Sequence, residues 1–119
     1  EKSIKKTNFL KETIQKLNLD VNVICQNVLD AKEKLAQDVF VARAFKPLPI
    51  ILKLIHNKAL NLKKFFVFLG KTGNNELLQA SKSWDIKYKQ RMSVTSKDSY
   101  IIEINNLKKI NWKILKLFL

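Results

Sequence analysis

Apolar residues recur every three to four positions in several parts of the chain, and each such part is predicted to form a helix. The first is residues 3–17, where four lysines and Glu12 lie between the apolar positions. Short helices are expected at residues 28–36 and 76–81. A longer helix follows Pro47, because two prolines preset its first turn, and it is expected to end near residues 57–61.

Strands are predicted where β-branched and aromatic residues run together or alternate with polar ones. Residues 19–25 alternate and then run apolar, with β-branched Val21, Val23 and Ile24, and residues 39–42 are an apolar run that begins with β-branched Val39. Residues 65–69 are apolar without interruption, which indicates a central strand that helices cover on both faces. Residues 84–94 and 99–104 alternate on either side of a Ser-rich turn, a pattern typical of an antiparallel hairpin at a sheet edge.

The predicted elements alternate between helix and strand until the final hairpin. This order indicates an α/β fold, with a parallel sheet and right-handed crossovers, closed by an antiparallel hairpin. The chain has no internal repeat and no low-complexity linker. We therefore expect one open sheet with helices packed on it.

Arg43 is the first candidate for a functional side chain. It is one of two arginines in the sequence, and it directly follows the predicted strand at residues 39–42. In open α/β sheets, ligands bind in the crevice outside the carboxyl ends of the strands. Arg43 is therefore expected at a binding site.

The charge of the chain leaves two interpretations open. The formal net charge is +13 over 119 residues, and the length fits one domain or part of one. Basic side chains that neutralise phosphates supply most of the sequence-independent affinity for nucleic acid. Nearly all the basic residues are lysines, however, and a solvated lysine-covered surface explains the same composition.

The remaining chemistry-bearing residues are sparse. Cys25 follows an apolar run and is expected to be a buried thiol, and a single cysteine excludes an internal disulfide. His56 is expected on a helix surface, with too few ligands in the sequence around it for a metal site. Gly70 to Thr72 mimics the end of a phosphate-binding loop, but Phe65 stands where that motif needs glycine. We expect a cytoplasmic protein, since no apolar run approaches the roughly 20 residues that span a bilayer.

Several strings resemble one family of class I methyltransferases, the bacterial small-subunit rRNA (guanine-N7) methyltransferases of the glucose-inhibited-division-B type. Residues 42–48, which read Ala-Arg-Ala-Phe-Lys-Pro-Leu, resemble its Arg-Ala-(Phe or Leu)-x-Pro-Leu motif after the fourth strand. Residues 1–10 resemble its acidic, Ser, paired-Lys and Phe-Leu string after the second strand. Residues 68–71 are similar to its Lys-Gly ending of the fifth strand, with the two residues exchanged. The resemblance extends from Glu1 to about Ile104.

The resemblance implies a Rossmann-like fold and methyl transfer from S-adenosylmethionine to N7 of a guanine in 16S rRNA. Glu1 would accept hydrogen bonds from the cofactor ribose, as acidic residues do in related folds. Val28 and Leu29 would line the adenine pocket, although the family usually has Arg-x-Glu at that place. Arg43 would contact both the cofactor and the RNA, because a planar guanidinium suits carboxylate and phosphate groups.

The same resemblance implies an RNA-binding surface and an incomplete domain. Lys63, Lys64 and Lys71 would contact RNA phosphates, and the alternative for each of them is an ordinary solvated surface lysine. The family's glycine-rich loop after the first strand is not among these 119 residues, so we expect a C-terminal part that is inactive alone. The full-length form is expected to be a monomer that acts on 16S rRNA or the small ribosomal subunit, without a metal.

Two points stay open at this stage. Residues 1–106 are predicted to form a partial methyltransferase domain, and residues 107–119 a basic amphipathic tail, either a packed helix, a membrane-surface helix or a product of translation past the end. The alternative function is a non-enzymatic basic α/β module that binds RNA or an anionic surface.

Overall fold

The computed structural model of the chain describes residues 1–43 and 45–110. The chain divides into two units, Glu1–Glu33 and Lys34–Leu119. The first unit contains one helix, α1 (Ile4–Lys16), as the spacing of apolar residues predicted. Ser3 caps α1, because its Oγ accepts a hydrogen bond from the backbone N–H of Lys6 at 3.3 Å.

The rest of the first unit differs from the sequence-based prediction. Residues 19–25 do not form a strand, although their side chains favour one, because a strand needs a neighbour to accept its ladder hydrogen bonds and none pairs with them among the described residues. Residues 28–36 do not form a helix. The side chain of Asn27 accepts a hydrogen bond from the Leu29 N–H at 3.1 Å, so a turn replaces the helix at its first residues.

Burial in the first unit also differs from the prediction. Cys25 is exposed, so the expected buried thiol is wrong. The apolar positions of α1 remain accessible as well, with Ile4 73% and Phe9 66% exposed. Thr7 is the buried residue of this helix.

The second unit is built on a four-stranded sheet with the order β1-β2-β4-β3. Its strands are β1 (Val39–Arg43), β2 (Lys64–Leu69), β3 (Trp84–Met92) and β4 (Tyr100–Lys109). β1 and β2 are parallel, whereas β4 is antiparallel to both β2 and β3. The predicted sheet, with a parallel start and an antiparallel hairpin at its edge, is therefore confirmed.

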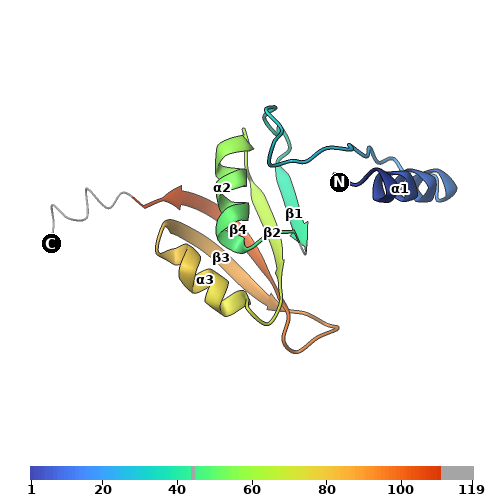
Figure 1. Ribbon diagram of the computed structural model, residues 1–119. Helices are drawn as coiled ribbons and strands as arrows, with labels where there is room; N and C mark the ends of the chain where they lie inside the picture. Colours follow the sequence, from blue (N-terminus) through green and yellow to red (C-terminus); the bar gives the residue numbers. More distant parts are fainter. Residues whose placement is uncertain (44, 111–119) are drawn as a thin grey trace, which may run out of the picture. The chain divides into compact units, whose positions relative to one another are not determined.

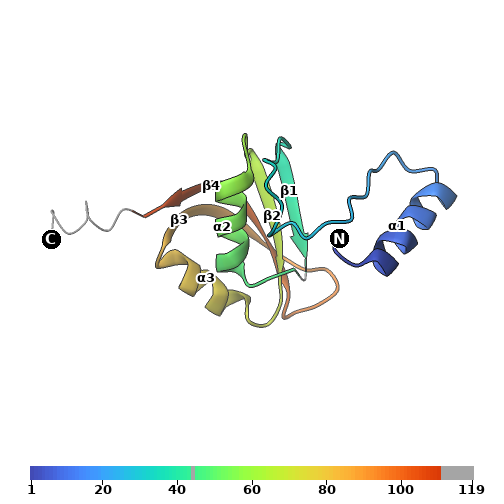
Figure 2. The ribbon, with the colours of Figure 1, turned by 45° about the horizontal axis from the view of Figure 1, so that its top comes forward.

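Two helices connect the strands and pack on one face of this sheet (Figures 1 and 2). They are α2 (Leu48–Lys58) and α3 (Gly73–Ser81). Pro47 occupies the N-cap position of α2 and makes no side-chain cap, and Pro49 lies in the first turn. The N–H groups of a first turn have no partner within the helix, so the N–H that proline lacks costs no helical hydrogen bond. His56 is exposed on α2 and its ring meets that of Trp84 edge to face at 5.0 Å between centroids.

The hydrophobic core lies between these helices and the sheet. Side chains alternate along a strand, so Phe65, Val67 and Leu69 of β2 all point to the helices and are buried. Phe68 points to the other face and is 41% exposed. The prediction that helices cover β2 on both faces is therefore wrong for the described part of this unit.

β4 is longer than predicted, because it continues to Lys109 and pairs with the start of β3. Residues 107–109 of the predicted tail thus belong to the sheet, and residues 111–119 lie outside the described residues. No described helix has the length and apolar character to cross a membrane.

One carboxylate is nearly enclosed on the sheet face away from α2. Glu103 is 7% exposed, and its Oε1 lies 3.1 Å from Nζ of Lys64 on the neighbouring strand. The hydrogen bond from Lys64 lowers the pKa of Glu103, burial opposes this, and the charges of Lys64, Lys89 and Arg91 lower it further. Glu103 is therefore held in its ionised form.

This pairing predicts acid-sensitive stability. A carboxyl group whose pKa is lower in the folded than in the unfolded chain stabilises the fold above the unfolded value, and the effect is lost as pH falls through the folded value. We expect the midpoint of urea unfolding to decrease as the pH is lowered from about 6 to about 3. In Glu103→Gln this decrease should be smaller. Glu33→Gln, at an exposed carboxylate, is the matched control. An equal decrease in Glu103→Gln would contradict the assignment.

Candidate functional site

Three turns of the second unit meet at one edge of the sheet. Arg43 ends β1, and Gly70 follows the parallel strand β2, so both lie at the carboxyl edge. β4 runs antiparallel to β2 with Tyr100 opposite Leu69, which brings the 93–99 hairpin turn to the same edge. In open α/β sheets this is the edge where ligands bind.

Arg43 lies at this edge, as the sequence predicted, and it is exposed. The strand registers place it in one row with Phe68, Ile101 and Arg91 across the four strands. Because neighbouring residues in register share a face, this row lies on the face opposite α2 and α3. The sheet therefore brings the two arginines of the chain to one face.

A first hollow, of about 430 Å³, lies on the helix side of the same edge, and we call it the strand-end hollow. Its lining includes Ala42, Pro47, Leu69, Gly70 and Glu76. Glu76 holds its walls together, because Oε1 accepts from the Leu48 N–H at 2.9 Å and Oε2 from the Thr72 hydroxyl at 3.0 Å. These bonds fix the start of α2 to the turn before α3.

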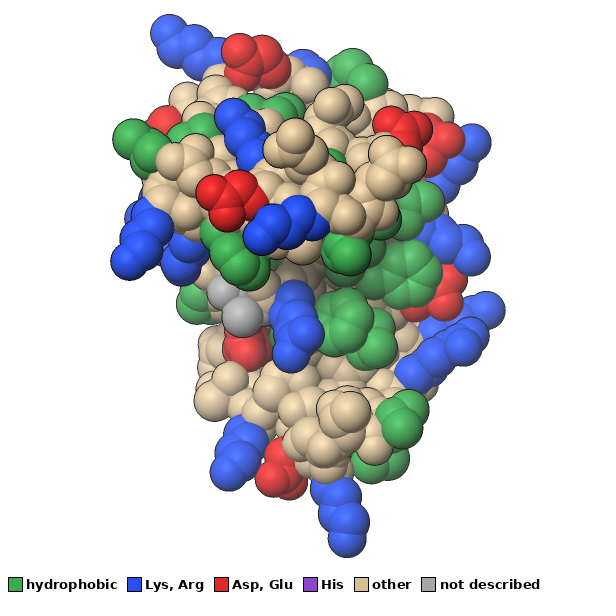
Figure 3. Space-filling view, turned by 90° about the vertical axis from the view of Figure 1, so that its right-hand side faces the viewer, with side chains coloured by type: hydrophobic (Ala, Val, Ile, Leu, Met, Phe, Trp, Pro, Cys, Tyr) green, Lys and Arg blue, Asp and Glu red, His purple; other side chains and the backbone are tan. Residues whose placement is uncertain are grey.

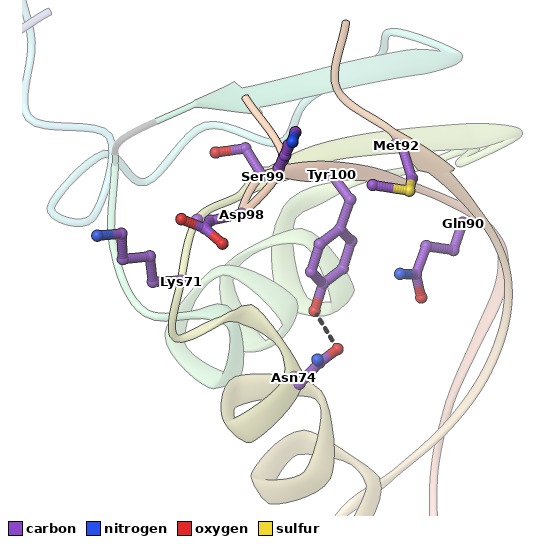
Figure 4. A pocket seen from close by; sticks show the side chains of 9 residues that line it. Lys71, Asn74, Gln90, Met92, Asp98, Ser99 and Tyr100 are labelled. Carbon is purple, nitrogen blue, oxygen red and sulfur yellow. Dashed lines mark hydrogen bonds between the residues drawn. The ribbon is translucent and has the colours of Figure 1, made fainter. Parts of the chain in front are cut away.

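A second hollow, of about 450 Å³, lies between that turn and the β3–β4 hairpin, and we call it the hairpin hollow. Figure 4 shows its walls, with Lys71 and Asp98 on one side of the Tyr100 ring and Gln90 and Met92 on the other. The Tyr100 hydroxyl donates to Oδ1 of Asn74 at 2.8 Å. Burial raises the pKa of Tyr100, with smaller contributions from Tyr88 and Glu76, so the hydroxyl remains a donor.

The lysines that the resemblance assigns to RNA have different surroundings. Lys63 lies 3.2 Å from Oδ2 of Asp38, and Lys64 pairs with Glu103, so a carboxylate already accompanies each ammonium group. Lys71 lines the hairpin hollow and is in neither of these ion pairs. Elsewhere, Figure 3 shows Lys and Arg side chains spread over the visible face with acidic groups between them.

The candidate cofactor residues Glu1, Val28 and Leu29 belong to the first unit. Glu1 is exposed, and its Oε1 accepts from the Ser3 N–H at 2.9 Å, which is the main reason that its pKa is lowered. The carboxylate is thus held in its ionised form. Val28 is half-buried and Leu29 is 39% exposed, with its N–H already bonded to Asn27.

Sequence reasoning missed the groups that build the two hollows, namely Asn74, Glu76, Lys97 and Tyr100. The predicted hairpin contained the necessary signal, since an antiparallel strand after β2 must begin at the carboxyl edge of β2. Among the described residues, no three His, Cys, Asp or Glu side chains lie together as a metal site would need.

Comparison with known proteins gives matches over nearly the whole chain. The family model of rRNA small subunit methyltransferase G (GidB) matches residues 1–105. The ribosomal RNA small subunit methyltransferase G of Pelagibacter ubique (strain HTCC1062) is 40% identical over 111 residues, 93% of this chain and 52% of that protein. Its namesake in Rickettsia bellii (strain OSU 85-389) is 31% identical over 110 residues, 92% of this chain and 56% of that protein.

The chain spans about half the length of the curated relatives it matches. Among solved structures, one provisionally described as an rRNA-methylase, from Clostridium thermocellum, has a TM-score of 0.57 with 11% sequence identity. That match covers 93% of this chain and 70% of the other. At this identity the likeness shows the fold alone, which is Rossmann-like.

Proposed function

Because the chain belongs to the rRNA small subunit methyltransferase G family, we propose that it is part of an enzyme that methylates N7 of a guanine in 16S rRNA. The observation that carries this proposal is the family match over residues 1–105. The position of Arg43 at the carboxyl edge of the sheet supports it, since ligands bind at that edge in such folds. The compartment we propose for the enzyme is the cytoplasm, where it would act on 16S rRNA or the small ribosomal subunit.

The cofactor we propose is S-adenosylmethionine, which supplies the methyl group from its sulfonium. Glu1 would accept hydrogen bonds from the ribose, and its lowered pKa keeps the carboxylate ionised for this task. Val28 and Leu29 would line the adenine pocket through their backbone, although the Leu29 N–H is already bonded to Oδ1 of Asn27. Arg43 would bind a carboxylate or phosphate group of the cofactor or the RNA.

The reaction makes modest chemical demands on the protein. Guanine N7 is already a lone-pair nucleophile, so the main contribution of the chain is to hold that nitrogen in line with the methyl group. No strong base is required, and the absence of a His or paired-carboxylate cluster among the described residues is compatible with this chemistry. Arg43, Lys63, Lys64 and Lys71 are the residues we propose to contact RNA.

The test is methyl transfer by a chimera. The Pelagibacter ubique relative, with its matching segment replaced by this chain, should transfer radiolabelled methyl groups from S-adenosylmethionine to small-subunit rRNA. Binding of S-adenosylmethionine is measured alongside by calorimetry. A chimera that folds but neither binds the cofactor nor methylates, while the unaltered relative is active, would contradict the proposal.

Within this chimera, Arg43→Ala should lower the methylation rate by about tenfold, because a guanidinium in contact with the cofactor or RNA contributes on the order of 1 to 3 kcal/mol. Lys53→Ala, which also removes one exposed positive charge, is the control and should leave the rate within about twofold. Equal methylation rates for the two variants would contradict a role of Arg43 in binding the cofactor or the RNA.

A further inference from the structure

The hairpin hollow has the parts of a nucleotide-binding site. Its volume of about 450 Å³ falls within the range of roughly 300–1,000 Å³ found for ligand pockets. It lies at the carboxyl edge of the sheet and adjoins the strand-end hollow, since Gly70 lines both. Whatever occupies it therefore sits next to the proposed reaction site.

The charges of the hollow favour an anion on one side. Lys71 comes from the turn after β2 and Lys97 from the hairpin turn, and neither belongs to an ion pair within the described residues. The first N–H of α3, that of Gly73, already donates to the Gly70 carbonyl oxygen at 2.9 Å, so the two lysines are the groups that would hold an anion here. Asp98 lines the hollow too, so the positive charge exceeds the negative by one.

The other wall suits a nucleobase. Met92 is 68% exposed and offers an apolar surface, while the amide of Gln90 lies beside it. The hydroxyl of Tyr100 donates to Oδ1 of Asn74, which fixes the orientation of the Asn74 amide, and the Nδ2 of Asn74 has no hydrogen-bond partner among the described residues. Amide groups can both donate to and accept from the edges of a base.

We infer that the hairpin hollow binds one nucleotide of single-stranded RNA, with its phosphate held by Lys71 and Lys97 and its base against Met92 and Gln90. This inference rests on the proposed function and specifies where RNA adjoining the target guanine is held. Single-stranded RNA is the fitting substrate, because its unstacked bases can enter a pocket whereas those of a duplex cannot.

The first test measures binding of a fluorescein-labelled 12-nucleotide single-stranded RNA to this chain by anisotropy between 50 and 200 mM salt. Lys71→Ala/Lys97→Ala should weaken binding about tenfold and reduce the salt slope by about 1.4, the value for two phosphate contacts on a single strand. The control is Lys53→Ala/Lys87→Ala, which removes two exposed charges elsewhere. If both pairs of substitutions lowered the affinity for RNA equally, binding would depend only on the net charge of the chain, and the inference would be wrong.

A second pair of variants keeps side-chain size constant. Gln90→Glu places a negative charge in the hollow and should weaken RNA binding about threefold to tenfold. Gln79→Glu, on the exposed surface of α3, is the matched control and should stay within about twofold. Circular dichroism verifies that each variant is folded. If Gln90→Glu binds RNA like its control, or if polyphosphate of equal charge competes as well as unlabelled RNA, the hollow is not a nucleotide site.

Failure of this inference is distinguishable from failure of the proposed function. RNA binding that depends on Lys71 and Lys97, together with a folded chimera that neither binds the cofactor nor transfers a methyl group, would support the subsite and contradict the enzyme. Methyl transfer by the chimera with no specific loss in Lys71→Ala/Lys97→Ala would support the enzyme and overturn the subsite.

Discussion

Phe65→Ala is expected to lower the free energy of unfolding by about 3 to 5 kcal/mol, a large part of the roughly 5 to 15 kcal/mol that a domain possesses. Phe65 is 1% exposed and belongs to the core between β2 and the two helices. Removing its ring leaves a cavity, because neighbours such as Leu52 and Ile104, both 0% exposed, are already fixed by packing. Urea unfolding followed by circular dichroism measures the loss.

Phe68→Ala is the matched control, since it makes the same chemical change three residues later in the same strand. Its ring lies on the opposite face of the sheet and is 41% exposed, so we expect a loss of about 1 kcal/mol or less. If both variants lost equal stability, the face that carries Phe68 and Arg43 would be as tightly packed as the helix side, contrary to the structure.

Gly73→Ala is expected to lower the free energy of unfolding by about 1 to 3 kcal/mol. An added Cβ would lie 2.7 Å from Cβ of Leu69 and 2.7 Å from the hydroxyl oxygen of Tyr100. Such contacts force α3 and the Tyr100 ring apart and break the bond to Asn74, which outweighs the smaller gain in helix propensity from alanine. Thermal unfolding by circular dichroism measures the change.

The control for this variant is Gly70→Ala, three residues earlier. A Cβ there has no neighbour within 4 Å, and no glycine in the described part of the chain has positive φ. Alanine should therefore be neutral or stabilise by up to about 1 kcal/mol, because it restricts the unfolded chain. A loss in Gly70→Ala as large as that in Gly73→Ala would show that glycine is needed for its backbone freedom, and not for the close approach of Tyr100.

Most elements formed where local signals in the sequence predicted them, whereas two predicted elements did not form. β1, β2, α2 and the hairpin formed where periodicity, prolines and turns predicted them, because these signals act over a few residues. The strand predicted at residues 19–25 and the helix predicted at residues 28–36 did not form, for different reasons. The first had strand propensity without a partner strand, and the second had helical spacing but an Asn27 side chain that competes for the backbone.

The family was also within reach of the sequence, and the family match over residues 1–105 confirms the resemblance seen in the motif around Arg43. This motif occupies seven consecutive residues, 42–48, so it can be recognised without knowledge of the fold. The assigned roles of Glu1, Val28, Leu29, Arg43, Lys63, Lys64 and Lys71 remain proposals. The structure adds that Lys63 and Lys64 have carboxylate partners, whereas Lys71 lines a hollow.

Local sequence patterns were enough to predict the α/β class, the hairpin ending and the position of Arg43 at a strand end. Which distant residues meet at that strand end became visible in the folded chain. Strand register placed Arg91 in line with Arg43, and the antiparallel return of β4 brought Tyr100 to Asn74 and Lys97 beside the same hollow as Lys71. The predicted hairpin indicates that its second strand begins at this edge, but it does not show which side chains meet there, because pairing between strands is fixed by packing of the whole sheet on its helices.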